Sequence, residues 1–369
     1  MSFPGMTDVF TRTAQQPGVM ESGELILIIL YALIATIGFL GNLFVCFIIL
    51  QHRPVRRPMN WLFLNLAISD STILVFLGFR HIITRAVSHP HGPTGDYLCK
   101  FLTGGNIAWV GAVSSMCSLM CIALERFFMV FKPTRYLSLF RVVIVKRVIG
   151  LSWLFGLLFN LPLFVVARFD EKISFCSETW PTSVASKVYA TIWLAVVAVI
   201  PGIFMAVLYS QITYNLWIKK AQQTLPDSQG AISRARRKIT KIVVTVSLIY
   251  CISWFPPLID YVMMVFAPAQ RHFGDTPHVA AVLMIVFNAS VNPLVYTFQS
   301  ETFRKQIKVS LFCLRAENTV NPLGEGEHLQ TWVPPLRKGQ GPLCPAPEER
   351  VNAMSRTGVD YMFLWLTGP

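Results

Sequence analysis

Seven long stretches of the chain are almost free of charged residues and are separated by polar segments. Each reaches the roughly 20 apolar residues that a helix needs to cross about 30 Å of hydrocarbon. Inside lipid every backbone amide must find an internal partner, so these spans are predicted to be helices; a barrel would instead show alternating strands of ~10 residues. The predicted spans are residues 25–50, 59–79, 101–124, 148–167, 188–218, 242–266 and 279–300.

The composition agrees with a membrane-embedded chain. Hydrophobic residues make up 53% of the sequence and charged residues only 14%, with a mean hydropathy of +0.52, whereas a soluble domain has about 25% charged residues. A soluble globular enzyme is therefore disfavoured, and the sequence offers neither a nucleophile–base pair nor a His/Cys cluster with metal-ligand spacing. The predicted fold class is an all-α membrane protein, a seven-transmembrane helix bundle that is not an enzyme.

Basic residues are distributed unequally between the polar segments. Of 32 Lys and Arg residues, 20 lie in the three segments after spans 1, 3 and 5 and just after span 7, and only 8 lie on the opposite side. The positive-inside rule then predicts an extracellular N-terminus, residues 1–24, and a cytosolic C-terminus. This asymmetry accounts for the net charge of +13 without nucleic-acid binding. Beyond the bundle, residues 25–300, we expect a juxtamembrane amphipathic helix, 301–315, and a mostly disordered cytoplasmic tail, 316–369.

Short motifs occur in order, one set in each span. They are Gly41 and Asn42 in span 1, the segment ending in Ser69 and Asp70 in span 2, Glu125 and Arg126 at the end of span 3, Trp153 in span 4, Pro201 and Tyr209 in span 5, Trp254 and Pro256 in span 6, and Asn292, Pro293 and Tyr296 in span 7. Over residues 25–313 this series resembles the rhodopsin-like G-protein-coupled receptors. The resemblance implies a plasma-membrane receptor that binds an extracellular ligand and activates a heterotrimeric G protein, with arrestin and membrane lipids as further partners.

The resemblance also implies a role for the motif residues in activation. Glu125 and Arg126 would pair at rest, and activation would release Arg126 toward Tyr209, Tyr296 and the G protein. The alternative is a structural Arg126 whose charged end reaches the membrane surface. The residues expected to take part in activation are Glu125, Arg126, Tyr209, Trp254, Asn292, Pro293 and Tyr296.

Asp70 is a carboxylate within a membrane span, which is costly unless it is paired and so suggests a functional site. Its candidate partners are Ser115, Asn288 and Asn292. In related receptors such an oxygen-rich pocket holds a sodium ion, and oxygen ligands suit a hard cation. The alternative is a protonated, hydrogen-bonded structural aspartate. No other cofactor is expected.

The cysteines outside the spans suggest two modifications. Cys99 and Cys176 face the oxidising side, and the resemblance implies that they form a disulfide. Cys99 precedes Arg126 by 27 residues, two more than is usual in the family, and Gly104-Gly105 is predicted to absorb the excess as a bulge or unwound turn. Cys313 follows the amphipathic run and is either palmitoylated or a free surface thiol.

The ligand class is narrowed by several observations. Upper span 3 has no acid to anchor a monoamine, and span 7 has no lysine to bind retinal. The segment from Cys176 through Glu178 and Trp180 to Pro181 is similar to one found in neuropeptide receptors of the neuropeptide Y, RFamide and orexin kind, and we expect Glu178 to be exposed at the pocket mouth. Nine acids on the outer face then favour a peptide that carries Arg or Lys.

A binding pocket is expected between the outer halves of the spans. Tyr261 lies seven residues after Trp254, so the two share a helix face, with Trp254 as the floor and Tyr261 as a wall. Arg80 and His81 support a rival ligand, an anionic lipid or small carboxylate, and a transporter or channel is a third hypothesis, although Asp70 is the only charge near the midplane. The predicted ligand contacts are Arg80, His81, Trp109, Glu178, Trp180, Trp254, Asp260 and Tyr261, and packing is the alternative for each aromatic.

Overall fold

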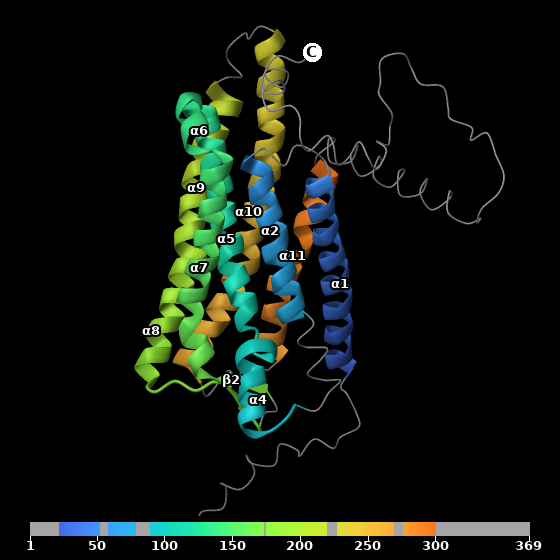
Figure 1. The fold of residues 1–369 in the computed structure, drawn as a ribbon, viewed down its shortest axis with the longest axis vertical. Coiled ribbons are helices and arrows are strands. Elements are labelled where there is room, and N and C mark those ends of the chain that lie inside the picture. Colours follow the sequence, from blue (N-terminus) through green and yellow to red (C-terminus); the bar gives the residue numbers. More distant parts are fainter. Residues whose placement is uncertain are drawn as a thin grey trace, which may run out of the picture.

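The computed structural model describes residues 22–51, 58–78, 89–172, 175–219, 227–268 and 276–299. Within these ranges seven helical segments are long and apolar enough to cross a membrane, which confirms the predicted seven-helix bundle (Figure 1). Each overlaps one predicted span. The predicted amphipathic helix at 301–315 and the tail at 316–369 lie outside the described residues.

The bundle is built from α-helices, short π-helical segments and one hairpin. In chain order the elements are α1 (Ser22–Gln51), α2 (Pro58–Ile73), η2 (Leu74–Gly78), α4 (Gly92–Leu98), η3 (Cys99–Thr103), α5 (Asn106–Phe131), α6 (Pro133–Leu139), α7 (Val142–Val166), β1 (Ala167–Asp170), β2 (Phe175–Glu178), α8 (Ser183–Leu194), η4 (Ala195–Val199), α9 (Ile200–Thr213), η5 (Tyr214–Lys219), α10 (Asp227–Phe266) and α11 (Thr276–Gln299).

Helix α5 runs through the middle of the bundle and packs against α2, α7 and α9, while α11 joins α1 to α10. Figure 1 shows α4 and the β1–β2 hairpin together at one end and α6 at the other. We refer to these as the hairpin end and the α6 end. Many large apolar side chains of α1, α7, α8 and α9 face outward, as expected where lipid covers a helix bundle.

Prolines lie within several of the long helices. Pro162, Pro256 and Pro293 lie inside α7, α10 and α11. Pro201 lies in the first turn of α9, just after the π-helical segment η4, and its ring nitrogen has no hydrogen to donate to the carbonyl of Val197 four residues earlier. The buried hydroxyl of Tyr250 on α10 donates to that carbonyl at 2.6 Å instead. A side chain from a neighbouring helix thus satisfies the acceptor that the proline leaves open.

The third span is broken at Gly104 and Gly105, as the unusual spacing of Cys99 and Arg126 predicts. The π-helical segment η3 ends at Thr103, and α5 begins at Asn106. Gly105 has φ +82°, a left-handed conformation that favours glycine. A Cβ on Gly104 would meet the backbone oxygen of Cys99. Both glycines are therefore needed for the unwound turn.

Candidate functional site

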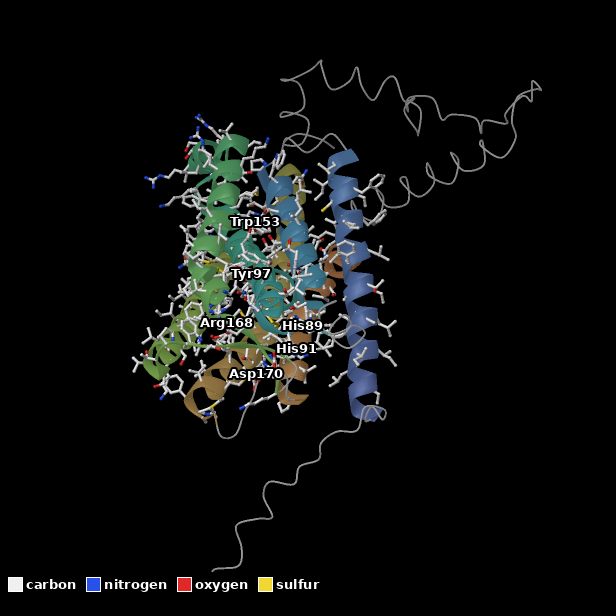
Figure 2. The ribbon with its side chains drawn as sticks, turned by 60° about the horizontal axis from the view of Figure 1, so that its bottom comes forward. His89, His91, Tyr97, Trp153, Arg168 and Asp170 are labelled. Carbon is white, nitrogen blue, oxygen red and sulfur yellow. A yellow bond between two sulfur atoms is a disulfide. The ribbon has the colours of Figure 1, made fainter. Side chains whose placement is uncertain are left out.

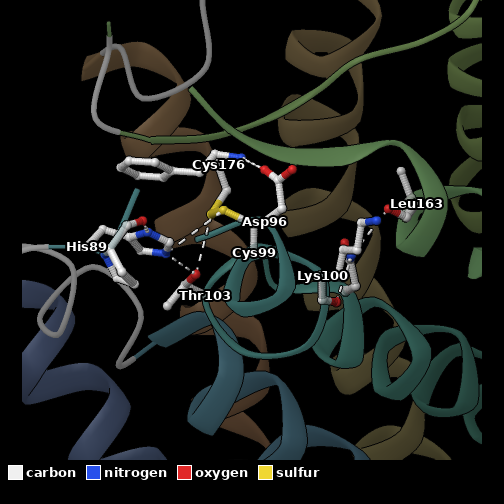
Figure 3. Close-up of a disulfide and its surroundings, with 10 residues drawn as sticks. His89, Asp96, Cys99, Lys100, Thr103, Leu163 and Cys176 are labelled. Atoms are coloured by element: carbon white, nitrogen blue, oxygen red, sulfur yellow. Dashed lines mark hydrogen bonds between the residues drawn. A yellow bond between two sulfur atoms is a disulfide. The ribbon is translucent and has the colours of Figure 1, made fainter. Parts of the chain in front are cut away.

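The hairpin is tied to the third span by a disulfide between Cys99 of η3 and Cys176 of β2, which confirms the predicted bridge (Figure 3). Their Cα atoms are 5.6 Å apart, within the ordinary range for disulfides. Asp96 of α4 adds a second tie, because its carboxylate accepts hydrogen bonds from Phe169 N at 3.0 Å and Arg168 Nη1 at 2.8 Å. The position of β2 above the bundle is therefore held from two sides.

His89 packs beneath this hairpin. Its ring stacks on Phe169 with centroids 4.0 Å apart, and its Nε2 lies 2.9 Å from Thr103 Oγ1. Figure 2 shows His89, His91, Arg168 and Asp170 gathered at the hairpin end, with Trp153 nearer the α6 end. Although His89 lies close to the sulfurs of Cys99 and Cys176, those sulfurs are joined to each other and are not available as thiolate ligands. This cluster is therefore structural and does not form a metal site.

A cavity of about 80 Å³ lies beneath β2, between the helices. Trp254 and Tyr261 both line it, so the predicted floor and wall belong to one pocket. Trp109 and Glu178 line it as well. The described residues around it include no lysine or arginine, and its walls are mainly apolar or aromatic. They are Gly104, Asn106, Trp109, Leu163, Ala167, Cys176, Ser177, Glu178, Trp193, Trp254, Pro257, Leu258, Tyr261, His278, Val282 and Ile285.

Glu178 is not the exposed acid that the sequence suggests. It is half-buried, and its Oε2 accepts hydrogen bonds from Tyr261 Oη at 2.8 Å and Trp180 Nε1 at 2.7 Å. Burial raises the pKa of the Glu178 carboxyl above its ordinary value, while the two hydrogen bonds favour the charged form and oppose the rise. The expectation of exposure was wrong because the sequence does not reveal that Tyr261 reaches across from α10.

An aromatic group supports this wall of the cavity. Trp109 of α5 meets Trp193 of α8 edge to face, with centroids 5.8 Å apart. Trp193 Nε1 donates to Tyr189 Oη at 2.9 Å, and Tyr189 packs on Trp180 at 5.0 Å. Trp180 therefore braces Glu178 and α8. The sequence prediction missed Tyr189 and Trp193, although their spacing of four residues places them on one helix face.

Asp260 is paired with a residue that the sequence prediction also missed. Its Oδ2 lies 3.4 Å from Nδ1 of His278, and both side chains are largely buried. His278 lines the cavity, and its ring meets Phe175 of β2 edge to face at 6.4 Å. His278 could have been found in the sequence because it is a lone polar residue near the start of an apolar span.

Deeper in the bundle, Asp70 is fully buried and accepts hydrogen bonds from Asn292 Nδ2 at 2.6 Å and Ser115 Oγ at 3.0 Å. Asn288, the third predicted partner, instead accepts a hydrogen bond from Trp254 Nε1 at 3.3 Å. Oδ1 of Asn292 is buried without a hydrogen-bond partner in the described part of the chain. The carboxylate and this amide oxygen together provide the donors that a hard cation prefers.

At the α6 end, Arg126 Nε lies 2.6 Å from Glu125 Oε2, and both side chains are buried. This is the local pairing expected for the resting arrangement. Tyr209 is buried nearby on α9, and its Oη accepts a hydrogen bond from Ser247 Oγ at 3.3 Å. Pro293 packs on Gly41 of α1. The predicted activation residues whose side chains are described thus lie within the interior of the bundle, from Trp254 to Arg126.

The predicted site residues divide into those inside and those outside the described part of the chain. Arg80, His81 and Cys313 lie outside the described residues, as does the side chain of Tyr296. Trp180 and Asp260 touch the residues that line the cavity, through Glu178 and His278. Of the predicted ligand contacts, the structure brings four together as walls of one cavity: Trp109, Glu178, Trp254 and Tyr261.

The sequence of this chain is similar to those of known receptors. Residues 41–296 match the family described as 7 transmembrane receptor (rhodopsin family). Somatostatin receptor type 5 of Rattus norvegicus is 28% identical over 291 residues, 78% of this chain and 77% of that receptor. The pyroglutamylated RF-amide peptide receptor of Rattus norvegicus is 25% identical over 349 residues, 89% and 80% of the two chains. Neuropeptide FF receptor 2 of Mus musculus is 26% identical over 297 residues, which are 74% of this chain and 69% of that receptor.

Proposed function

Because this chain belongs to the rhodopsin family of seven-transmembrane receptors, we propose that it is activated by an extracellular neuropeptide and signals to a heterotrimeric G protein. The single observation that carries the ligand class is Glu178, a half-buried acid on a cavity whose described walls include no lysine or arginine. Burying a carboxylate is costly without a partner of opposite charge. A basic group of the ligand would provide that partner, and the similar receptors named above bind peptides.

The rival ligand is an anionic lipid or small carboxylate. It was suggested by Arg80 and His81, whose positions lie outside the described residues. In the described cavity an anion would meet Glu178 without a compensating cation, which favours the peptide. A transporter or channel is a weaker proposal still, since Asp70 is the single acid in the middle of the described spans.

The chain is a multi-pass membrane protein, and we place it in the plasma membrane with the hairpin end outside. The excess of Lys and Arg in the segments at the α6 end supports this orientation, as does the disulfide at the hairpin end. The α6 end would then face the G protein. Arrestin and membrane lipids are proposed as further partners on the family resemblance alone.

Signal transmission would depend on Glu125 and Arg126. In the buried pair the guanidinium is held against its own helix at 2.6 Å, so it must separate from Glu125 before it can meet a partner protein. Trp254 lies on the floor of the cavity and is joined to Asn288 of α11. A ligand in the cavity would therefore shift the two states through its differential contacts with Trp254.

We also propose that Asp70, Ser115 and Asn292 hold a sodium ion in the resting receptor. The buried carboxylate and the unpartnered Oδ1 of Asn292 fit such an ion. Asn288 would contribute only through Trp254, to which it is hydrogen-bonded. The ion would neutralise the buried carboxylate and stabilise the packing of α2, α5 and α11.

The function is tested by screening a peptide library and a panel of anionic lipids on cells that express the full chain, with calcium and cyclic AMP as readouts. We expect peptides bearing Arg or Lys to activate, and Glu178→Gln to lower their potency without lowering the maximal response. Glu171→Gln is the matched control, since Glu171 is an exposed acid of the same hairpin region. Activation by lipids alone, or equal potency in both variants, would contradict the proposal.

A further inference from the structure

The two oxygens of the Glu178 carboxylate differ in their contacts. Tyr261 Oη donates to Oε2 at 2.8 Å, and Trp180 Nε1 donates to the same atom at 2.7 Å. A carboxylate has about four acceptor positions, two on each oxygen. Both positions on Oε2 are therefore filled by donors from within the protein. Among the described residues no group donates to the other oxygen, Oε1.

Oε1 is the oxygen that remains for a ligand. It is not one of the fully buried, unpartnered side-chain atoms in the described part of the chain, so it borders open space. Glu178 lines the cavity beneath β2, and the described walls of that cavity include no lysine or arginine that would offset its charge. The two donors on Oε2 are neutral groups, which stabilise a negative charge without cancelling it. Glu178 therefore offers one acceptor atom to whatever occupies the cavity.

A single free oxygen changes which cation is favoured. At most carboxylates a guanidinium group has an advantage over an ammonium group, because its planar fork bonds both oxygens at once. At Glu178 the second N–H of such a fork would meet Oε2, where Tyr261 and Trp180 already donate. A guanidinium group is then restricted to a hydrogen bond with Oε1. An ammonium group is a compact charge with three rotatable donors, and one of them makes the same bond.

On the basis of the proposed peptide ligand, we propose that Glu178 binds one basic side chain of the ligand end-on through Oε1 alone, so that lysine is accepted as readily as arginine, and that Tyr261 and Trp180 set this specificity by occupying Oε2. The two donors come from different parts of the chain, since Tyr261 lies on α10 and Trp180 follows β2. Trp180 is held in turn by Tyr189, with ring centroids 5.0 Å apart. Tyr261 and Trp180 act through Glu178 and are positioning residues for its recognition of a cation.

The test compares n-propylguanidinium with n-butylammonium, which reproduce the side chains of arginine and lysine and each carry one positive charge. Their affinities for the purified full-length receptor are measured at neutral pH by saturation-transfer NMR titration. The part of each signal that Glu178→Gln removes is binding at this carboxylate. In the wild type we expect the two affinities to agree within about threefold, because each cation makes one charge-assisted hydrogen bond.

The variants Tyr261→Phe and Trp180→Phe each remove one donor from Oε2 and keep an aromatic ring. In the double variant the preference for guanidinium should rise about tenfold, because a second charge-assisted hydrogen bond becomes available. The single variant whose donor occupies the position facing Oε1 should show the same rise. Losing a donor also destabilises the carboxylate charge, but this weakens both cations alike, so the ratio of their affinities is the readout.

Tyr189→Phe is the matched control. It removes a hydroxyl from the same aromatic wall, where Tyr189 Oη donates to the backbone oxygen of Phe159 and accepts from Trp193 Nε1 without contacting Glu178. The ratio should be unchanged in this variant. Melting temperatures of the unliganded proteins verify folding, and the two single variants provide the comparison if the double variant is unstable.

An unchanged ratio in the double variant and in both single variants would overturn the end-on subsite. An equal rise in Tyr189→Phe, or a wild type that already prefers guanidinium by about tenfold, would overturn it as well. In each of these cases the proposed function survives if Glu178→Gln still weakens both cations. If Glu178→Gln removes no binding of either cation, the cationic contact on which the proposed function rests is contradicted, and the subsite with it.

Discussion

The hydroxyl of Tyr250 offers a sharp test of how the bundle switches between states. It is buried and donates at 2.6 Å to the Val197 carbonyl that Pro201 leaves without its usual donor. The structure containing this bond also has Arg126 paired with Glu125. We therefore expect the bond to belong to the resting state and to break when α10 moves relative to η4 and α9.

Tyr250→Phe keeps the ring and its packing on Trp254, with centroids 5.6 Å apart, and removes only the hydroxyl. The Val197 carbonyl then stays buried without this donor, which costs about 1–3 kcal/mol. If the cost falls on the resting state alone, the ratio of active to resting receptor rises roughly 5- to 150-fold. Agonist-independent nucleotide exchange on the G protein should increase by up to that factor, until most of the receptor is in the active state. Agonist potency should increase as well.

Tyr31→Phe is a matched control. Tyr31 is also fully buried and its hydroxyl donates at 2.6 Å to a backbone oxygen, that of Val279, but it joins α1 to α11. Both variants should lower the melting temperature of the purified receptor, and only Tyr250→Phe should raise basal exchange. Equal basal exchange in wild type and Tyr250→Phe, with the same loss of thermal stability as Tyr31→Phe, would refute the assignment of this bond to the resting state.

Four further predictions follow from the other sites. Cys176→Ser should reduce surface expression and ligand binding, measured by flow cytometry and radioligand assay, because a bridge spanning 77 residues is worth up to about 4.5 kcal/mol by chain entropy; normal binding would count against it. Sodium, exchanged for potassium at constant ionic strength, should lower agonist affinity in the wild type but not in Asp70→Asn. Burial raises the pKa of Glu178, so the folded form holds this proton more tightly than the unfolded form, and stability falls as pH rises through the raised pKa. Glu178→Gln should therefore have a higher melting temperature than wild type at neutral pH. The difference between the two melting temperatures should disappear below about pH 4.3. Arg126→Ala should keep ligand binding and lose nucleotide exchange, and retained exchange would refute its coupling role.

Features that depend on local periodicity could be read in the sequence. The seven spans follow from runs of apolar residues, and the shared face of Trp254 and Tyr261 follows from a spacing of seven residues. The unwound turn at Gly104-Gly105 could be located because the spacing of Cys99 and Arg126 is two residues too long for an uninterrupted helix of the expected register. In each case the relevant geometry is set within one segment of the chain.

Contacts between spans were predicted less well. Asp70 does meet Ser115 and Asn292, but Asn288 bonds to Trp254 instead. The bond from Tyr250 to Val197 joins residues 53 positions apart, and no local pattern indicates which buried donor reaches an acceptor on another helix. Such pairs depend on the rotation and axial position of each helix in the bundle.

Glu178 shows most directly how the information in the sequence differs from that in the tertiary structure. By itself the sequence determined that this acid follows the bridged Cys176 by two residues and lies near the outer mouth of a helix bundle. Only the tertiary structure decided that it is half-buried and bonded to Tyr261, 83 residues away. The physical reason is that residue type determines the chance of facing water, whereas burial depends on which neighbouring helices and strands cover the side chain. Here β2 is held by its disulfide above α10, so the carboxylate faces the interior of the bundle.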